Sequence, residues 1–285
     1  MRSETVTFFS EGTLVTGTLR LPDRATTPSP GIVQGPGWLG LRDAGLYEPY
    51  HHALTDAGFA VLIFDYRGFG DSAGDRGMLS PGAQLEDLVN AVTWLVSRQD
   101  IDASRIGVFG SGGTGGGNAV LLAARDERVR CAVSQVPVAD GSDWLRRMRG
   151  TEDEWQAFLD RLADDRALRV ATGEGARVHP REEIMIPSAE RRATSVKKDV
   201  DGRIPTSVPL AAADEILAYR PVDAAPRVPG LCIVAVNGDL VTPTDHAEAL
   251  YDAAPAPKQL IMQYDTTHYA GYRLHGPEVI PRIVD

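Results

Sequence analysis

Short apolar runs that alternate with amphipathic segments place the strongest constraint on how this chain can fold. Ala60–Asp65 (AVLIFD) is a nearly continuous apolar stretch, which is the pattern of a parallel strand covered on both faces. Ala83–Val96 follows it and carries apolar residues at helical spacing. Arg105–Phe109, Val129–Val136 and Leu231–Val236 are predicted as further strands. Strands that alternate with helices indicate an α/β fold with a mostly parallel sheet wound by right-handed crossovers.

The pattern changes at two places, which predicts the domain organisation. Thr5–Phe9 and Leu14–Leu21 alternate apolar and polar residues around a Glu-Gly turn, so they are predicted to form an N-terminal β-hairpin. Residues 141–226 are rich in charge, with helical stretches at Glu152–Arg166 and Ala211–Tyr219 and few strand signals. We therefore expect a core formed by residues 1–140 and 227–285, with 141–226 inserted between the late strands as a helical lid.

Charge and hydropathy restrict the classes of partner. The net charge is −10, and nucleic acids and anionic membranes need clustered Lys and Arg, so neither is expected as a partner. No apolar run approaches the length of a membrane span, and the N-terminal MRSETVTFFSEG lacks the apolar stretch of a signal peptide. These features predict a cytoplasmic protein that acts on a small-molecule substrate, and a homodimer is the assembly we consider.

The two cysteines, Cys131 and Cys232, each lie inside an apolar run. This setting is typical of buried core thiols rather than of a disulfide framework or a metal site. The sequence therefore predicts neither a metal nor a cofactor.

Two glycine-rich stretches, together with the order of elements, resemble the α/β-hydrolase superfamily. FDYRGFGDSAGDRG (Phe64–Gly77) is similar to the loop after the fourth strand of its bacterial members, and GPGWLGLRD (Gly35–Asp43) is similar to the turn after the third strand. The resemblance is closest to small bacterial esterases of the dienelactone-hydrolase-like and cocaine-esterase-like branch. It implies an α/β-hydrolase fold, with helices on both faces of the sheet. It also implies a hydrolase that acts on an ester, lactone, amide or activated C–C bond.

Asp239 and His268 lie where this superfamily keeps its catalytic acid and base. Asp239 follows the strand Leu231–Val236 and precedes Pro243 by four residues, and His268 follows the last predicted strand. A fixed carboxylate can hold an imidazole in one tautomer, and the pKa of imidazole suits proton transfer near neutrality. The other histidines lack this context.

The turn that should carry the nucleophile is irregular. The superfamily requires small residues on both sides of the nucleophile, and the chain has Gly110-Ser-Gly-Gly-Thr-Gly-Gly-Gly-Asn118 here. Counting forward from the strand indicates Gly112, whereas counting back from the helix indicates Gly113. Neither residue has a nucleophilic side chain. Ser111 and Thr114 are the fallback nucleophiles, although both are out of register.

Two explanations fit a glycine at this position. Either a serine was changed to glycine to trap a substrate, or the protein lost covalent catalysis and kept the His268–Asp239 dyad. The second explanation leads to an alternative function, a lyase, isomerase or cofactor-free oxygenase in which His268 is the base.

The resemblance also implies an oxyanion hole and a substrate pocket. One backbone N–H should come from Thr114, or from Gly113 in the other register, and a second from Trp38 in the turn after the third strand. Tyr66, which follows the fourth strand, and Trp144 of the lid are predicted to line the substrate site.

Overall fold

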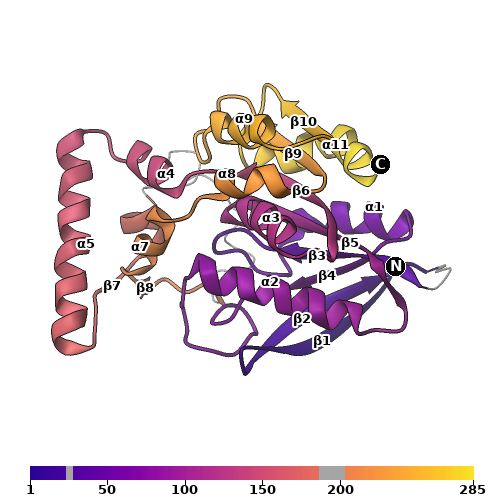
Figure 1. Ribbon diagram of the computed structural model, residues 1–285, viewed down its shortest axis with the longest axis horizontal. Coiled ribbons are helices and arrows are strands. Elements are labelled where there is room, and N and C mark those ends of the chain that lie inside the picture. Colours follow the sequence, from indigo (N-terminus) through magenta and orange to yellow (C-terminus); the bar gives the residue numbers. More distant parts are fainter. Residues whose placement is uncertain (24–27, 186–202) are drawn as a thin grey trace.

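An eight-stranded, mostly parallel sheet forms the centre of the protein in the computed structural model, which describes residues 1–23, 28–185 and 203–285 (Figure 1). The strand order is β1-β2-β4-β3-β5-β6-β9-β10, in which β2 pairs antiparallel with β1 and β4 and the other neighbours are parallel. The bounds are β1 Arg2–Ser10, β2 Thr13–Leu21, β3 Ser29–Gly35, β4 Ala60–Phe64, β5 Ile101–Gly113, β6 Val129–Pro137, β9 Leu231–Val236 and β10 Lys258–Gln263. This arrangement confirms the predicted fold class.

Helices bury both faces of the sheet. On β4, Val61 packs into a cluster with Tyr50 and Leu54 of α1, whereas Leu62 and Phe64 belong to the core on the opposite face. The apolar run that predicted a strand covered on both faces is therefore explained by its packing. The helices are α1 (Glu48–Asp56) and α11 (Gly276–Val284) on the first face, and α2 (Pro81–Val96), α3 (Thr114–Arg125) and α9 (Thr244–Ala253) on the second.

The chain between β6 and β9 is mostly helical. Its longest element, α5 (Glu152–Thr172), lies at the far left of Figure 1, away from the sheet. A capping box formed by Thr151 and Glu154 begins this helix, and Gly173, at φ 81°, ends it. The other elements are α4 (Gly141–Arg147), β7 (Arg177–Val178), η2 (Pro180–Ile184), β8 (Val208–Pro209), α7 (Ala212–Leu217), α8 (Pro221–Ala224) and η4 (Ala225–Arg227). Elsewhere, η1 (Gly45–Tyr47) precedes α1 and α10 (Ala270–Leu274) precedes α11.

The expectation that both cysteines are buried in the core is wrong. Cys131 is exposed and Cys232 is half-buried. Each lies near the beginning of its strand, at the end of the sheet opposite the loops that carry Asp239 and His268, although the first residues of the two strands, Val129 and Leu231, are buried. An apolar run predicts a strand, but it does not show which of the strand's side chains the helices bury.

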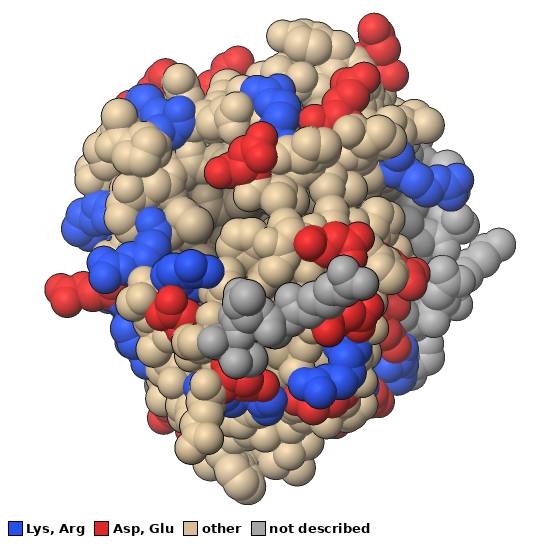
Figure 2. Space-filling view, turned by 90° about the vertical axis from the view of Figure 1, so that its right-hand side faces the viewer, with Lys and Arg blue, Asp and Glu red and all other residues tan. Residues whose placement is uncertain are grey.

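Acidic and basic side chains are interspersed on the face shown in Figure 2, and its described side chains form no continuous basic stripe. Within residues 1–23, 28–185 and 203–285, no helix combines the length and apolar character needed to cross a membrane.

Candidate active site

Asp239 and His268 meet at the carboxyl end of the sheet. β9 and β10 are parallel neighbours, so the loops that follow them emerge at the same edge. His268 Nδ1 lies 2.7 Å from Asp239 Oδ2, and both side chains are almost completely buried. The contact at Nδ1 leaves the other ring nitrogen, Nε2, directed away from the carboxylate, and His268 lines a cavity at this edge.

Three further hydrogen bonds fix the carboxylate of Asp239. The backbone N–H groups of Val241 and Thr242 donate to Oδ1 over 2.7 and 3.1 Å, and the Thr242 hydroxyl donates to Oδ2 over 3.1 Å. Burial alone would raise the pKa of Asp239, but His268 and the two backbone donors outweigh it and hold that pKa below its usual value. The carboxylate therefore remains ionised beside the imidazole.

The sharp turn between β5 and α3 falls at Gly113. Its backbone has φ 45° and ψ −111°, a combination that side chains rarely adopt, and α3 begins at the next residue. A Cβ built on Gly113 would lie 4.0 Å from its nearest neighbours, the methyl groups of Thr242 and Val138, so a small side chain would fit in the space. Gly112 also has a positive φ, 75°.

The disagreement between the two counts along the turn has a structural cause. β5 continues to Gly113 instead of ending near Phe109, because Ser111 and Gly113 still pair with Gln135 and Pro137 of β6. The count from the strand therefore began too early. Gly115, two residues beyond Gly113, must be small, since a Cβ there would lie 2.7 Å from the Pro36 carbonyl oxygen.

Ser111 and Thr114 have other surroundings. The Ser111 hydroxyl is buried at the cavity and lies 2.7 Å from the Tyr272 hydroxyl. Thr114 is completely buried at the start of α3, and its carbonyl accepts a hydrogen bond from Tyr219. In the part of the chain that the structure describes, neither side chain is hydrogen-bonded to the imidazole of His268.

The cavity beside His268 has an empty volume of about 850 Å³, including its open mouth. Trp38 and Trp144 both line it, and their rings pack edge to face with centroids 6.0 Å apart. Trp144 is held by a 2.8 Å hydrogen bond from its indole N–H to the Val241 carbonyl. Tyr66 is not among the described lining residues; its buried ring packs against Phe64 on the opposite side of the β3 end.

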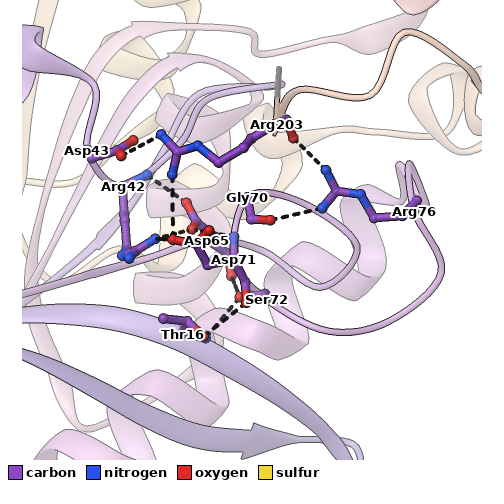
Figure 3. Close-up of polar contacts among 9 residues, drawn as sticks. All are labelled: Thr16, Arg42, Asp43, Asp65, Gly70, Asp71, Ser72, Arg76 and Arg203. Atoms are coloured by element: carbon purple, nitrogen blue, oxygen red, sulfur yellow. Dashed lines mark hydrogen bonds and ion pairs between the residues drawn. The ribbon is translucent and has the colours of Figure 1, made fainter. Parts of the chain in front are cut away.

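An ion-pair network links Arg203, in the chain between β6 and β9, to the loops that follow β3 and β4 (Figure 3). Arg203 pairs with Asp43 over 2.5 Å and with Asp71 over 3.5 Å, and its carbonyl accepts a hydrogen bond from Arg76. Asp71 in turn pairs with Arg42, which also pairs with the buried Asp65. Ile204, next to Arg203, lines the cavity, so this network positions part of the cavity wall.

Comparisons with known proteins agree with this architecture. The family model described as X-Pro dipeptidyl-peptidase (S15 family) matches residues 11–269. The chain belongs to this family. This S15-family chain is 34% identical over 268 residues to an uncharacterized 31.7 kDa protein of the traX-finO intergenic region of Escherichia coli, covering 92% of this chain and 90% of that protein.

A thiohydrolase of Eupenicillium brefeldianum is 22% identical to the S15-family chain over 250 residues, which is 82% of this chain and 77% of that protein. The crystal structure of the α/β hydrolase GrgF from Penicillium sp. sh18 superimposes with a TM-score of 0.81 at 23% identity, covering 100% of this chain and 97% of that one. The likeness in structure shows the fold, and membership of the S15 family supports a hydrolase.

Several residues at the site escaped the sequence analysis. Thr242 contacts the predicted acid and base, and its place three residues after Asp239 could have indicated this role. Tyr47, Tyr272 and Ile204 come from η1, α10 and the chain between β6 and β9, and no local pattern relates them to the loops that carry Asp239 and His268.

Proposed function

We propose that the chain hydrolyses an acyl substrate, with His268 as the general base and Asp239 as the acid that orients it. The observation that carries this proposal is the 2.7 Å contact between His268 Nδ1 and Asp239 Oδ2 at the wall of a cavity that also contains Gly113. Asp239 fixes the tautomer in which Nδ1 carries the proton, so Nε2 is free to accept one. The substrate would be an ester or a thioester, the latter suggested by the thiohydrolase relative.

In this proposal Gly113 occupies the nucleophile position. Its backbone conformation and the empty space beside it suit the side chain of a nucleophile at a strand-to-helix turn. The backbone N–H groups of Thr114, which follows Gly113, and of Trp38, which lines the cavity, would stabilise the oxyanion. With glycine at 113, the dyad would remove a proton from a water molecule, which then attacks the carbonyl directly.

Restoring a serine tests the proposal. We expect Gly113→Ser to hydrolyse p-nitrophenyl esters at least about 100-fold faster than the parent chain, since a positioned nucleophile with its base contributes orders of magnitude. Gly112→Ser is the matched control and should gain little. A gain in neither variant, with both correctly folded, would refute the role assigned to this turn.

A second candidate function follows from the same glycine. The absence of a nucleophilic side chain at Gly113 favours proton-transfer chemistry by the dyad, as in a lyase, isomerase or cofactor-free oxygenase. This alternative predicts that Gly113→Ser reduces the natural turnover by filling the space, whereas the hydrolytic proposal predicts an increase in ester hydrolysis.

A further inference from the structure

Three hydroxyl groups from distant parts of the chain converge on the cavity next to the dyad. They belong to Tyr47, Ser111 and Tyr272, whose residues are 4%, 1% and 5% exposed. Ser111 Oγ lies 2.7 Å from Tyr272 Oη, and Ser111 also interacts with the phenol of Tyr47. Polar groups buried this deeply are costly unless each is hydrogen-bonded, so the arrangement of their protons matters.

Counting protons shows what this hydroxyl cluster offers to a ligand. The Gly37 N–H can only donate, and it donates to Tyr47 Oη over 3.2 Å. The cluster therefore keeps all three of its own protons for other acceptors. The Ser111–Tyr272 hydrogen bond uses one of them, and the interaction between Tyr47 and Ser111 uses at most one more. Among the described residues at least one O–H is left without an acceptor, and it belongs to a group that lines the cavity.

The cluster remains a donor at neutral pH. Burial raises the pKa of both Tyr47 and Tyr272, so both phenols keep their protons. An unpaired O–H in this setting favours an oxygen acceptor, and a neutral one, because a carboxylate held by a single hydroxyl donor would not recover its cost of desolvation.

The cluster is close to the dyad, and most of the surrounding wall is apolar, although Arg181 and Thr242 also line it. The ring centroids of Tyr272 and His268 are 6.5 Å apart, so an oxygen bound by the cluster would be a few bonds from a carbonyl group placed at the dyad. Leu39, Leu41, Leu46, Met185 and Ile204 line the same cavity. These walls would cover the apolar remainder of the molecule.

We propose that the hydroxyl cluster is a subsite for a neutral oxygen acceptor, an ether or a carbonyl oxygen, within the acyl chain of the substrate. The preferred substrate is then an apolar acyl compound that carries a second oxygen a few bonds from its reacting carbonyl. This inference rests on the proposed acyl hydrolysis for its choice of substrate, but binding to the subsite does not require a nucleophile.

The binding of four anilides to the natural chain tests the subsite, and this test does not require the chain to hydrolyse them. They are the N-phenyl amides of hexanoic, propoxyacetic, 3-ethoxypropanoic and 4-methoxybutanoic acids, in which an oxygen replaces one CH₂ of the hexanoyl chain. Binding would be measured by quenching of the fluorescence of Trp38 and Trp144. We expect at least one oxygen-containing anilide to bind about threefold to tenfold more tightly than hexananilide, as one hydrogen bond provides.

Tyr272→Phe removes one hydroxyl and keeps the ring, so it should reduce this preference to less than twofold while leaving the affinity for hexananilide nearly unchanged. Ser111→Ala should have the same effect if Tyr272→Phe folds poorly, and Tyr264→Phe, at an exposed tyrosine, is the matched control. Equal affinities for all four anilides, or an equal loss for all four in both variants, would overturn the subsite. A failure of Gly113→Ser to hydrolyse any ester would instead count against the proposed reaction, so the two failures are distinguishable.

Discussion

The hydroxyl of Thr242 lies 3.1 Å from Asp239 Oδ2, the carboxylate oxygen that also contacts His268. The same hydroxyl lies 3.4 Å from His268 Nδ1, and the methyl group of Thr242 borders the space beside Gly113. Thr242 therefore contacts the acid and the base and faces the empty nucleophile position, which makes it a positioning residue for the proposed reaction.

Thr242→Val should impair the dyad without unfolding the protein. Valine keeps the shape but removes a hydrogen bond to the carboxylate, so we expect kcat in a Gly113→Ser background to fall about tenfold, equivalent to about 1.4 kcal/mol. Loss of this donor should also raise the pKa of Asp239 and shift the acid limb of the pH–rate profile upward. Thr242→Ser keeps the hydroxyl and should retain most of the activity. If kcat falls as much in Thr242→Ser as in Thr242→Val, the hydroxyl of Thr242 does not position the dyad.

The burial of His51 should make stability depend on pH. This side chain is completely buried against Gln34, and burial, followed by the charges of Arg20 and His52, lowers its pKa to about 3. An unfolded histidine titrates near ~6.5, so below that pH the unfolded chain binds one more proton than the folded chain. This contribution to stability is complete above the unfolded pKa and is lost as the pH falls toward the folded one, at about 1.4 kcal/mol per pH unit.

Urea unfolding of the parent and of His51→Gln between pH 7 and pH 4 would measure this dependence. The His51 variant should have the smaller slope of unfolding free energy against pH. His52→Gln, at the half-exposed neighbour on α1, should change the slope far less than His51→Gln, because burial and not the charge of His52 is the main cause of the lowered pKa of His51. Parallel curves for the parent and the His51 variant would contradict the pKa assigned to His51.

The close approach of β5 and α3 at Gly110 should tolerate no side chain. A Cβ at Gly110 would lie 2.0 Å from the Gly115 carbonyl oxygen and 2.7 Å from Ala119 Cβ. We expect Gly110→Ala to lower the free energy of unfolding by about 3 kcal/mol, since the strand and the helix would have to separate. Gly45→Ala, where no atom lies within 4 Å, should change it by less than about 0.5 kcal/mol. Thermal unfolding of both variants would measure these changes, and equal stability of Gly110→Ala and Gly45→Ala would contradict the prediction.

Arg203→Ala should weaken substrate binding more than it weakens the fold. The ion pairs of Arg203 with Asp43 and Asp71 are partly exposed, so their loss should cost less than about 1 kcal/mol of stability. Ile204 would lose its anchor at the cavity wall, and we expect KM for ester hydrolysis in the Gly113→Ser background to rise about threefold to tenfold. Arg105→Ala, which removes an exposed ion pair with Asp102, is the control and should leave KM unchanged. An unchanged KM for Arg203→Ala would show that the ion pairs of Arg203 do not position the cavity wall.

The sequence alone was sufficient for the elements that depend on local patterns. Leu231–Val236 matches β9 residue for residue, and the helix predicted over Ala83–Val96 is α2, Pro81–Val96, because apolar runs and helical periodicity record burial directly. Asp239 and His268 were predicted from the resemblance and from their positions after strands, and the structure brings them to 2.7 Å of each other, while their catalytic roles stay a prediction. The prediction fails where the apolar pattern stops. β5 extends to Gly113, four residues beyond its predicted end, since glycines carry no hydropathy signal.

Tertiary structure alone decided which residues surround the predicted acid and base. The sequence determined an α/β chain and indicated Asp239 and His268, after its late strands, as the candidate acid and base. Strand pairing and packing decide where the turn at Gly113 lies and that Thr242 contacts Asp239. They also bring together the hydroxyl groups of Tyr47, Ser111 and Tyr272, although Tyr47 and Tyr272 are 225 residues apart in the sequence. Local sequence patterns report which face of an element is buried, but not which other element covers it.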